Sequence, residues 1–214
     1  MKKLTPLALI TATVCFVVSC KDKHPPEPQY YDNYIPLKVG NYWIYQVFDV
    51  DEQGYGPPLN LYDSSYISKD TVINGNTYYY LTISPATLPE NTYNKWLRDS
   101  LHYLVDHEGH IYFSSEDFTN IIHAQYSISG TDTTFSVVQK MESKNAFFSA
   151  PAGNFTTSDC MTTLKYQSQP GAPAIIKHLH RRYTKNIGII SETKLPYVSE
   201  IRYKESRLVR YHLK

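Results

Sequence analysis

The sequence predicts a single all-β domain, built as one antiparallel curved sheet, a half-barrel or a sandwich. Nine glycines punctuate the chain about every twenty residues, which is the spacing of strand pairs separated by turns. The segments between them, such as 42–48 and 77–83, are rich in β-branched and aromatic residues. Two tight hairpins are expected, at 72–77 around an Asn-Gly pair and at 104–112. Strands joined so closely must be antiparallel.

The first nineteen residues have the form of a secretory signal. Two lysines precede an apolar run that ends at Val18, and this run is shorter than the roughly 20 apolar residues that a membrane span needs. The run closes with Val17-Val18-Ser19-Cys20, which resembles the lipobox of bacterial lipoproteins. We therefore expect residues 1–19 to be removed and Cys20 to carry acyl chains such as palmitate. Because each buried methylene contributes about 0.8 kcal/mol, two or three chains would hold the protein on a membrane.

Residues 20–33 are expected to form the lipidated N-terminus and a proline-rich tether. Three prolines stand among charged and polar residues there, and proline keeps the chain extended because its ring fixes φ. Lys21 directly follows the cysteine, which resembles the sorting pattern of outer-membrane lipoproteins. The sequence thus predicts an outer-membrane lipid anchor that faces the periplasm or the cell surface, followed by the all-β domain over 34–214.

Charge and cysteine content exclude several functions. Removing the signal takes away two of the 21 basic residues and none of the 20 acidic ones, so the formal net charge changes from +1 to −1. A near-neutral chain offers no electrostatic basis for binding nucleic acid. With Cys15 removed and Cys20 acylated, Cys160 is the last free thiol, so no intramolecular disulfide can form. No neighbour in the sequence lowers its pKa, and a buried strand cysteine is expected rather than a nucleophile.

One segment departs from the strand pattern. In 115–123, Phe118, Ile121 and Ile122 recur at helical spacing behind a serine cap. This spacing is typical of one short helix near 115–124.

The opening of the domain carries a motif of spaced Pro, Gly, Asn and aromatic residues. Segment 34–45 reads Pro-Leu, two residues, Gly-Asn, one residue, Trp, one residue, Tyr, directly after the tether. Together with segments 71–79, 151–155 and 183–190, it resembles uncharacterised Bacteroidota-type envelope lipoproteins. The resemblance implies an antiparallel β fold and supplies no catalytic residues. A structural role is expected for the motif, because Gly-Asn can make a tight turn before the aromatic residues enter the core.

Metal-ligand candidates occur in two places. Residues 106–110 read Asp-His-Glu-Gly-His, so a hairpin tip could bring His107, His110 and a carboxylate together. The same residue types are ordinary in solvated turns, and we expect no metal or other cofactor. His178 and His180 are spaced to share a strand face, but the neighbouring lysine and arginines would repel a cation.

Tyrosine is the residue most in excess, with 20 copies. The run Tyr78, Tyr79 and Tyr80 must point rings to both faces of a strand, so at least one ring lies outside the core or in a groove. Such rings could bind a sugar or line a cavity, or they could serve only as amphipathic strand formers.

A basic stretch over 177–185 contains two further ligand-binding candidates, Arg181 and Arg182. It could contact anionic lipid headgroups, lipopolysaccharide phosphates or acidic glycans. The alternative is an ordinary wet strand face whose charges are balanced elsewhere.

No motif for a serine nucleophile, a phosphate loop or a dinucleotide site occurs, so we expect no enzyme. The favoured hypothesis is a non-catalytic outer-membrane or cell-surface lipoprotein whose β domain binds an envelope component, a glycan or a protein partner. One alternative is a lipid or lipoprotein carrier, which needs a dry cavity of roughly several hundred Å³. Another is a metal-dependent hydrolase that uses His107 and His110.

Overall fold

The computed structural model describes residues 30–86, 92–129, 132–169, 171–195 and 201–214. Cys20, the signal and most of the tether lie outside these ranges. The described residues form strands and turns without any helix, and accordingly no helix in them is long and apolar enough to cross a membrane. The all-β prediction is confirmed. The strands are β1 (Tyr42–Val50), β2 (Pro58–Ile73), β3 (Asn76–Ser84), β4 (Tyr93–Ser100), β5 (Tyr103–Asp106), β6 (Ile111–Ser114), β7 (Ile121–Ser129), β8 (Asp132–Ala150), β9 (Gly153–Tyr166), β10 (Ile175–Thr184), β11 (Gly188–Lys194) and β12 (Tyr203–His212).

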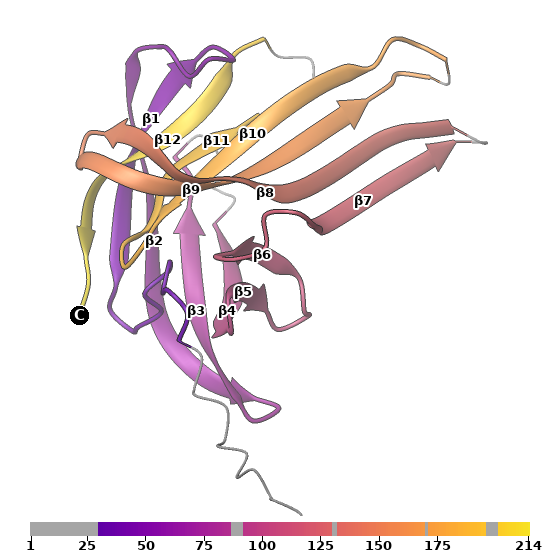
Figure 1. Ribbon diagram of the computed structural model, residues 1–214. Helices are drawn as coiled ribbons and strands as arrows, with labels where there is room; N and C mark the ends of the chain where they lie inside the picture. Colours follow the sequence, from indigo (N-terminus) through magenta and orange to yellow (C-terminus); the bar gives the residue numbers. More distant parts are fainter. Residues whose placement is uncertain (1–29, 87–91, 130–131, 170, 196–200) are drawn as a thin grey trace, which may run out of the picture.

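All twelve strands belong to one antiparallel sheet with the order β6-β5-β4-β3-β2-β1-β12-β11-β10-β9-β8-β7. The first and last strands pair at its centre, and each half of the chain extends outward from them as a meander. The sheet is so strongly curved that it is nearly closed on itself (Figure 1). A curved sheet can bury a core on its concave side without a second layer. Residues from both halves meet there, among them Tyr45, Leu81, Leu97, Cys160, Tyr183 and Leu208.

The opening motif of the domain has a structural role, as expected. Asn41 is fully buried, its Nδ2 donates to the carbonyl of Pro36 at 2.7 Å, and its Oδ1 accepts the N–H of Lys214 at 2.9 Å. Trp43 Nε1 donates to the carbonyl of Ile187 at 2.6 Å. The motif therefore connects the start of the domain to the residues that follow its last strand and to the turn before β11.

Both predicted hairpins are present. Asn74 and Gly75 have φ angles of 50° and 78° between β2 and β3, as a type I′ turn requires. Gly109, with φ of 92°, lies in the turn between β5 and β6.

The prediction of a short helix near 115–124 is wrong. Ser114 Oγ accepts hydrogen bonds from the backbone N–H groups of Glu116 and Asp117 at 3.2 and 2.8 Å. Asp117 Oδ1 in turn accepts hydrogen bonds from the backbone N–H groups of Thr119 and Asn120. Such side-chain bonds to the backbone offer the chain an alternative to helical hydrogen bonds. The β-branched pair that begins at Ile121 then joins the sheet as β7.

Candidate functional site

A groove on the concave side of the sheet lies between β1–β4 and β10–β12. Leu81 and Ile189 line three small cavities there, of about 40, 40 and 20 Å³, and Ile83 lines the two larger ones. We call this feature the concave groove. Its apolar floor is formed by Leu81, Ile83 and Ile189, and charged side chains stand beside that floor. The combination of an apolar cavity with a few polar groups is typical of ligand sites.

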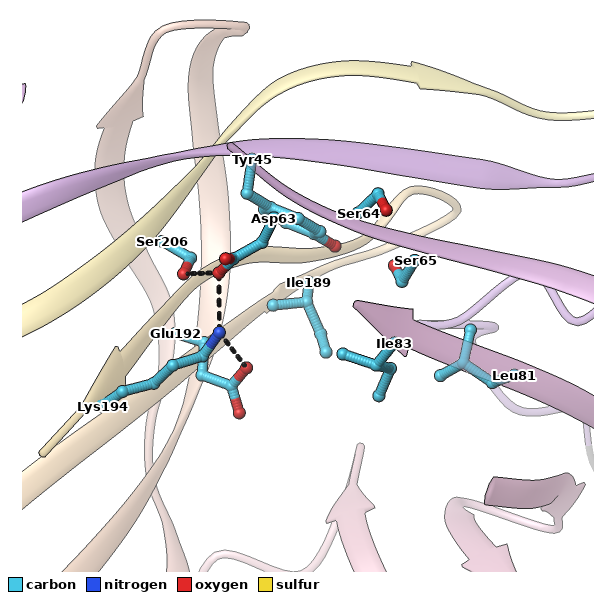
Figure 2. Close-up of a pocket in the computed structure, with 10 residues that line it drawn as sticks. All are labelled: Tyr45, Asp63, Ser64, Ser65, Leu81, Ile83, Ile189, Glu192, Lys194 and Ser206. Carbon is cyan, nitrogen blue, oxygen red and sulfur yellow. Dashed lines mark hydrogen bonds and ion pairs between the residues drawn. The ribbon is translucent and has the colours of Figure 1, made fainter. Parts of the chain in front are cut away.

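Four charged side chains form a network along the groove. Lys194 Nζ lies 2.7 Å from Asp63 Oδ2 and 3.9 Å from Glu192 Oε2, while Ser206 donates to the same Asp63 oxygen (Figure 2). Arg181 Nε donates to Glu192 Oε1 at 2.8 Å. The register explains this arrangement, because Glu192 pairs with Arg181 on β10 and with Ser206 on β12. Three separate strands thus direct polar groups to one place.

The network holds Glu192 and Lys194 in their charged forms. Burial alone would raise the pKa of Glu192, but Arg181 and Lys194 outweigh burial and hold that pKa at about 2. Burial would lower the pKa of Lys194, and the carboxylates of Glu192 and Asp63 raise it instead. Since neither Glu192 nor Lys194 titrates near neutral pH, neither can act there as a general acid or base. Buried ion pairs add little net stability, so stability alone does not account for this network.

Lys95 on β4 is the groove cation that makes no ion pair with any described residue. Its Nζ lies 3.9 Å from the ring centroid of Tyr112 and 6.0 Å from that of Tyr93. Burial lowers the pKa of Lys95 to about 8, and the charge of Arg181 adds to this effect. A perturbed amine in a cleft is a candidate for function. Below pH 8, Lys95 adds a positive charge to the groove without an ion-pair partner among the described residues, while the carboxylates of Glu192 and Asp106 favour its charged form.

At the hairpin tip the structure does not bring His107 and His110 together. Asp106, Glu108 and His110 form a group with potential ligand atoms within 4.8 Å of one another, and the exposed His107 is not part of it. Asp106 Oδ1 accepts the N–H groups of Glu108 and His110, both at 2.9 Å, and Oδ2 lies 3.1 Å from His110 Nδ1. Burial would raise the pKa of Asp106, but these hydrogen bonds lower it. Both oxygens of the Asp106 carboxylate therefore already have hydrogen-bond partners within this hairpin.

The tyrosine run is divided between the two faces of β3, as the alternation requires. Tyr79 packs against the core on the concave side. Tyr78 is buried on the convex side, where its hydroxyl accepts a hydrogen bond from Arg98 Nε at 3.0 Å. Tyr80 lies on the same face, with its ring centroid 4.6 Å from that of Trp96. The three rings therefore do not form one surface.

The arginine pair is divided in the same way. Arg181 points into the concave groove, while Arg182 points to the convex side, where its Nη1 donates to Ser191 Oγ at 3.0 Å and to Glu205 Oε1 at 3.2 Å. The structure does not bring the two side chains together into one basic patch. Sequence analysis did not identify four groove residues, Asp63, Lys95, Glu192 and Lys194. The one local signal was that Glu192 and Lys194 are two residues apart, a spacing that places both on the same face of a strand.

Cys160 is buried in the core, which confirms the expectation of a structural strand thiol. Gln139 Nε2 lies 3.0 Å from its sulfur. Burial raises the pKa of Cys160, so the thiolate needed for nucleophilic attack is disfavoured.

Comparison with known proteins shows the fold. No protein-family model and no curated protein matches this chain. A solved structure from Bacteroides fragilis, named as an exported protein with a YmcC-like fold, matches with a TM-score of 0.51 and 11% identity over 85% of this chain and 100% of that chain. A second, from Parabacteroides distasonis and named as a lipoprotein, matches with a TM-score of 0.50 and 11% identity over 86% of this chain and 100% of that chain. At this identity the likeness concerns architecture, and the curved sheet of this chain is similar to the folds of both proteins.

Proposed function

We propose that this protein is an exported lipoprotein, held at the outer membrane by a lipid on Cys20, which binds an acidic glycan of the envelope in the concave groove without catalysing a reaction. The observation that carries the proposal is Lys95, an amine without an ion-pair partner among the described residues, placed beside tyrosine rings and an apolar floor. Membrane attachment and ligand binding are separate parts of the proposal and have separate tests.

The lipobox and the tether support the membrane attachment. The two similar solved structures are named as an exported protein and a lipoprotein, and they come from Bacteroides and Parabacteroides, the group to which the opening motif points. A labelled fatty acid supplied to the producing cells should be incorporated into the wild-type chain. The Cys20→Ala variant should carry no label and should be released or left unprocessed. Persistent labelling of this variant would contradict the lipid site.

The groove favours a ligand that combines a negative charge with a ring-shaped apolar face. A sugar carboxylate can pair with Lys95, while the sugar ring can lie on Tyr93 or Tyr112, both of which line the same cavity. Charged hydrogen bonds of this kind contribute more than neutral ones. Acidic glycans are the envelope components with this chemistry.

The two alternatives from the sequence fit the groove less well. An acyl carrier needs a dry, enclosed cavity of roughly several hundred Å³, whereas the groove cavities measure about 40 Å³ or less and charged side chains line the two larger ones. A hydrolase at the hairpin tip would need both His107 and His110 as ligands, and the structure directs only His110 toward the carboxylates.

The binding test uses the full-length protein in detergent, titrated with oligogalacturonate and with a neutral maltooligosaccharide of equal length. We expect the acidic probe to bind more tightly, and Lys95→Gln to weaken that binding roughly tenfold because it removes a charge-assisted contact. Lys95→Arg should retain most of the affinity. Lys69→Gln is the matched change on the convex face, on β2, and it should leave the affinity for the acidic probe unchanged. Equal affinity for both probes would contradict the proposed ligand.

A further inference from the structure

We propose that Glu142, Asp159 and His180 form a binding site for a divalent first-row transition metal ion, such as Zn²⁺. The three residues lie on the adjacent strands β8, β9 and β10, on the convex side, away from the concave groove. Each offers one ligand atom, and these atoms lie within 4.8 Å of one another. One imidazole nitrogen and two carboxylate oxygens are a ligand set that such ions accept.

Asp159 provides the observation that points to a missing cation. Asp159 is 7% exposed, and its Oδ2 lies 2.6 Å from His180 Nδ1. Its other oxygen, Oδ1, is buried without any hydrogen-bond partner among the described residues. Buried carboxylate oxygens are almost always paired, because leaving one without a partner is costly. A metal ion bound by this carboxylate would remove that cost.

A β-bulge positions the second carboxylate. Met141 pairs with Cys160 and Ser143 pairs with Asp159, so Glu142 is an extra residue without a partner on β9. Met141 is fully buried in the core, which fixes the strand on one side of the bulge. Bulges re-aim side chains and are over-represented near functional sites. Because Glu142 itself is exposed, an ion can reach the site from solvent.

The basic neighbours that the sequence places beside His180 have other partners. Arg181 lies on the concave side and bonds to Glu192, while Arg182 bonds to Glu205. Lys144, which follows the bulge, lies 3.4 Å from Glu116. The sequence predicts that these charges repel a cation, and the pairing of Arg181 and Arg182 with carboxylates reduces that repulsion at His180.

His180 also opens onto space for a fourth ligand. Together with His178, Arg182 and Glu205 it lines a polar cavity of about 210 Å³ on the convex side. Of the three proposed ligands, His180 is the one that lines this cavity, so a water that completes the coordination shell can reach the ion from the His180 side. The hairpin tip has the same residue types, but both oxygens of its buried carboxylate, Asp106, already accept hydrogen bonds, and it serves as the internal control.

The test uses the full-length protein in detergent, without a polyhistidine tag and freed of metal by chelation. Zn²⁺ binding is measured by competition with a chromophoric chelator. We expect a single tight site in the wild type and a loss of roughly tenfold or more in affinity for Glu142→Gln, as expected for removal of a metal ligand. Since Glu142 is exposed, this variant should keep the wild-type melting temperature in the absence of metal.

Two further variants locate the site. His180→Gln should weaken Zn²⁺ binding at least as much as Glu142→Gln, and the matched change His110→Gln at the hairpin tip should leave the affinity unchanged. Zn²⁺ should also raise the melting temperature of the wild type but not that of Glu142→Gln. The proposal is overturned if the wild type binds no Zn²⁺, if Glu142→Gln binds it as tightly as the wild type, or if His110→Gln is the variant that loses it.

Discussion

The two faces of β10–β12 carry similar charged side chains in different surroundings. On the convex face, Arg182 and Arg207 both bond to Glu205, at 3.2 and 2.7 Å, and their guanidinium groups lie 4.6 and 5.7 Å from the ring centroid of Phe148. On the concave face, Arg181 and its partners line cavities that open to solvent. Alternation along the same strands thus supplies charges to both sides of the sheet.

The difference between the faces comes from the β8–β9 hairpin. Its turn lies beside β12 (Figure 1), where the N–H of Ala152 donates to the carbonyl of Leu208 at 2.9 Å. The ring of Phe148, just before this turn, packs against the guanidinium groups of Arg182 and Arg207. No described segment covers the concave charges in this way. Phe148 covers one side of the convex ion pairs, and the polar cavity that His180 also lines borders their other side. The carboxylate on the convex face is still the more enclosed one, since the side chain of Glu205 is 2% exposed and that of Glu192 is 20% exposed. Enclosure of the carboxylate, rather than residue type, distinguishes the two faces.

The largest effect is expected for Glu205→Gln on the covered face. Glu205 is 2% exposed between two arginines, so removing its charge leaves two half-buried cations without their carboxylate. We expect a loss of about 3–5 kcal/mol in the free energy of unfolding at pH 7, measured by urea denaturation. Binding of the acidic glycan by the remaining folded protein should not change. A loss smaller than that of Glu192→Gln would contradict the structural role assigned to the convex ion pairs.

A smaller loss, about 1–3 kcal/mol, is expected for Glu192→Gln on the open face, because water can reach Arg181 there and Lys194 keeps Asp63 as a partner. The folded pKa of Glu192, about 2, lies below its ordinary value of 4.5, so its stabilising effect is present above pH 4.5 and is lost as the pH falls toward 2. Urea denaturation of both proteins across this range should show their difference shrinking with acid. A constant difference would contradict the assigned pKa.

How much of this the sequence could reveal depends on the range of the interactions. The Asn74-Gly75 turn was predictable because two adjacent residues determine it. Ser114 and Asp117 were misinterpreted because the residues that cap helices also close turns, and the choice depends on whether the next segment joins the sheet. The groove was beyond prediction, since Asp63, Lys95 and Glu192 come from strands that are far apart in the chain.

On the concave face, Lys95→Met should change the free energy of unfolding in the opposite direction and stabilise the protein. Burial lowers the folded pKa of Lys95 from 10.5 to about 8, so the charged amine disfavours folding at neutral pH. Removing it should raise the free energy of unfolding by about 1–2 kcal/mol at pH 7 and abolish selectivity for the acidic glycan. A variant that is less stable than the wild type would contradict the burial of this charge.

The same pKa gives the wild type a pH dependence. Lys95 is protonated below pH 8 and neutral above it, so affinity for the acidic glycan should fall as the pH rises through about 8. Over that range the stability of the unliganded protein should rise, because the unfolded chain still binds the proton that the folded chain has released. Lys95→Arg should bind with no pH dependence in this window.

The smallest effect is expected for Lys69→Ala on the convex face of β2. Its Nζ lies 4.8 Å from the ring centroid of Tyr80 and 5.6 Å from that of Trp96, but Lys69 itself is exposed. An exposed cation over aromatic rings contributes about 0.5–1 kcal/mol, which urea denaturation can resolve. Glycan affinity should stay at the wild-type value. If this variant weakened binding as much as Lys95→Gln does, the ligand would lie on the Tyr80–Trp96 side, and accessible aromatic rings rather than the groove cation would define the site.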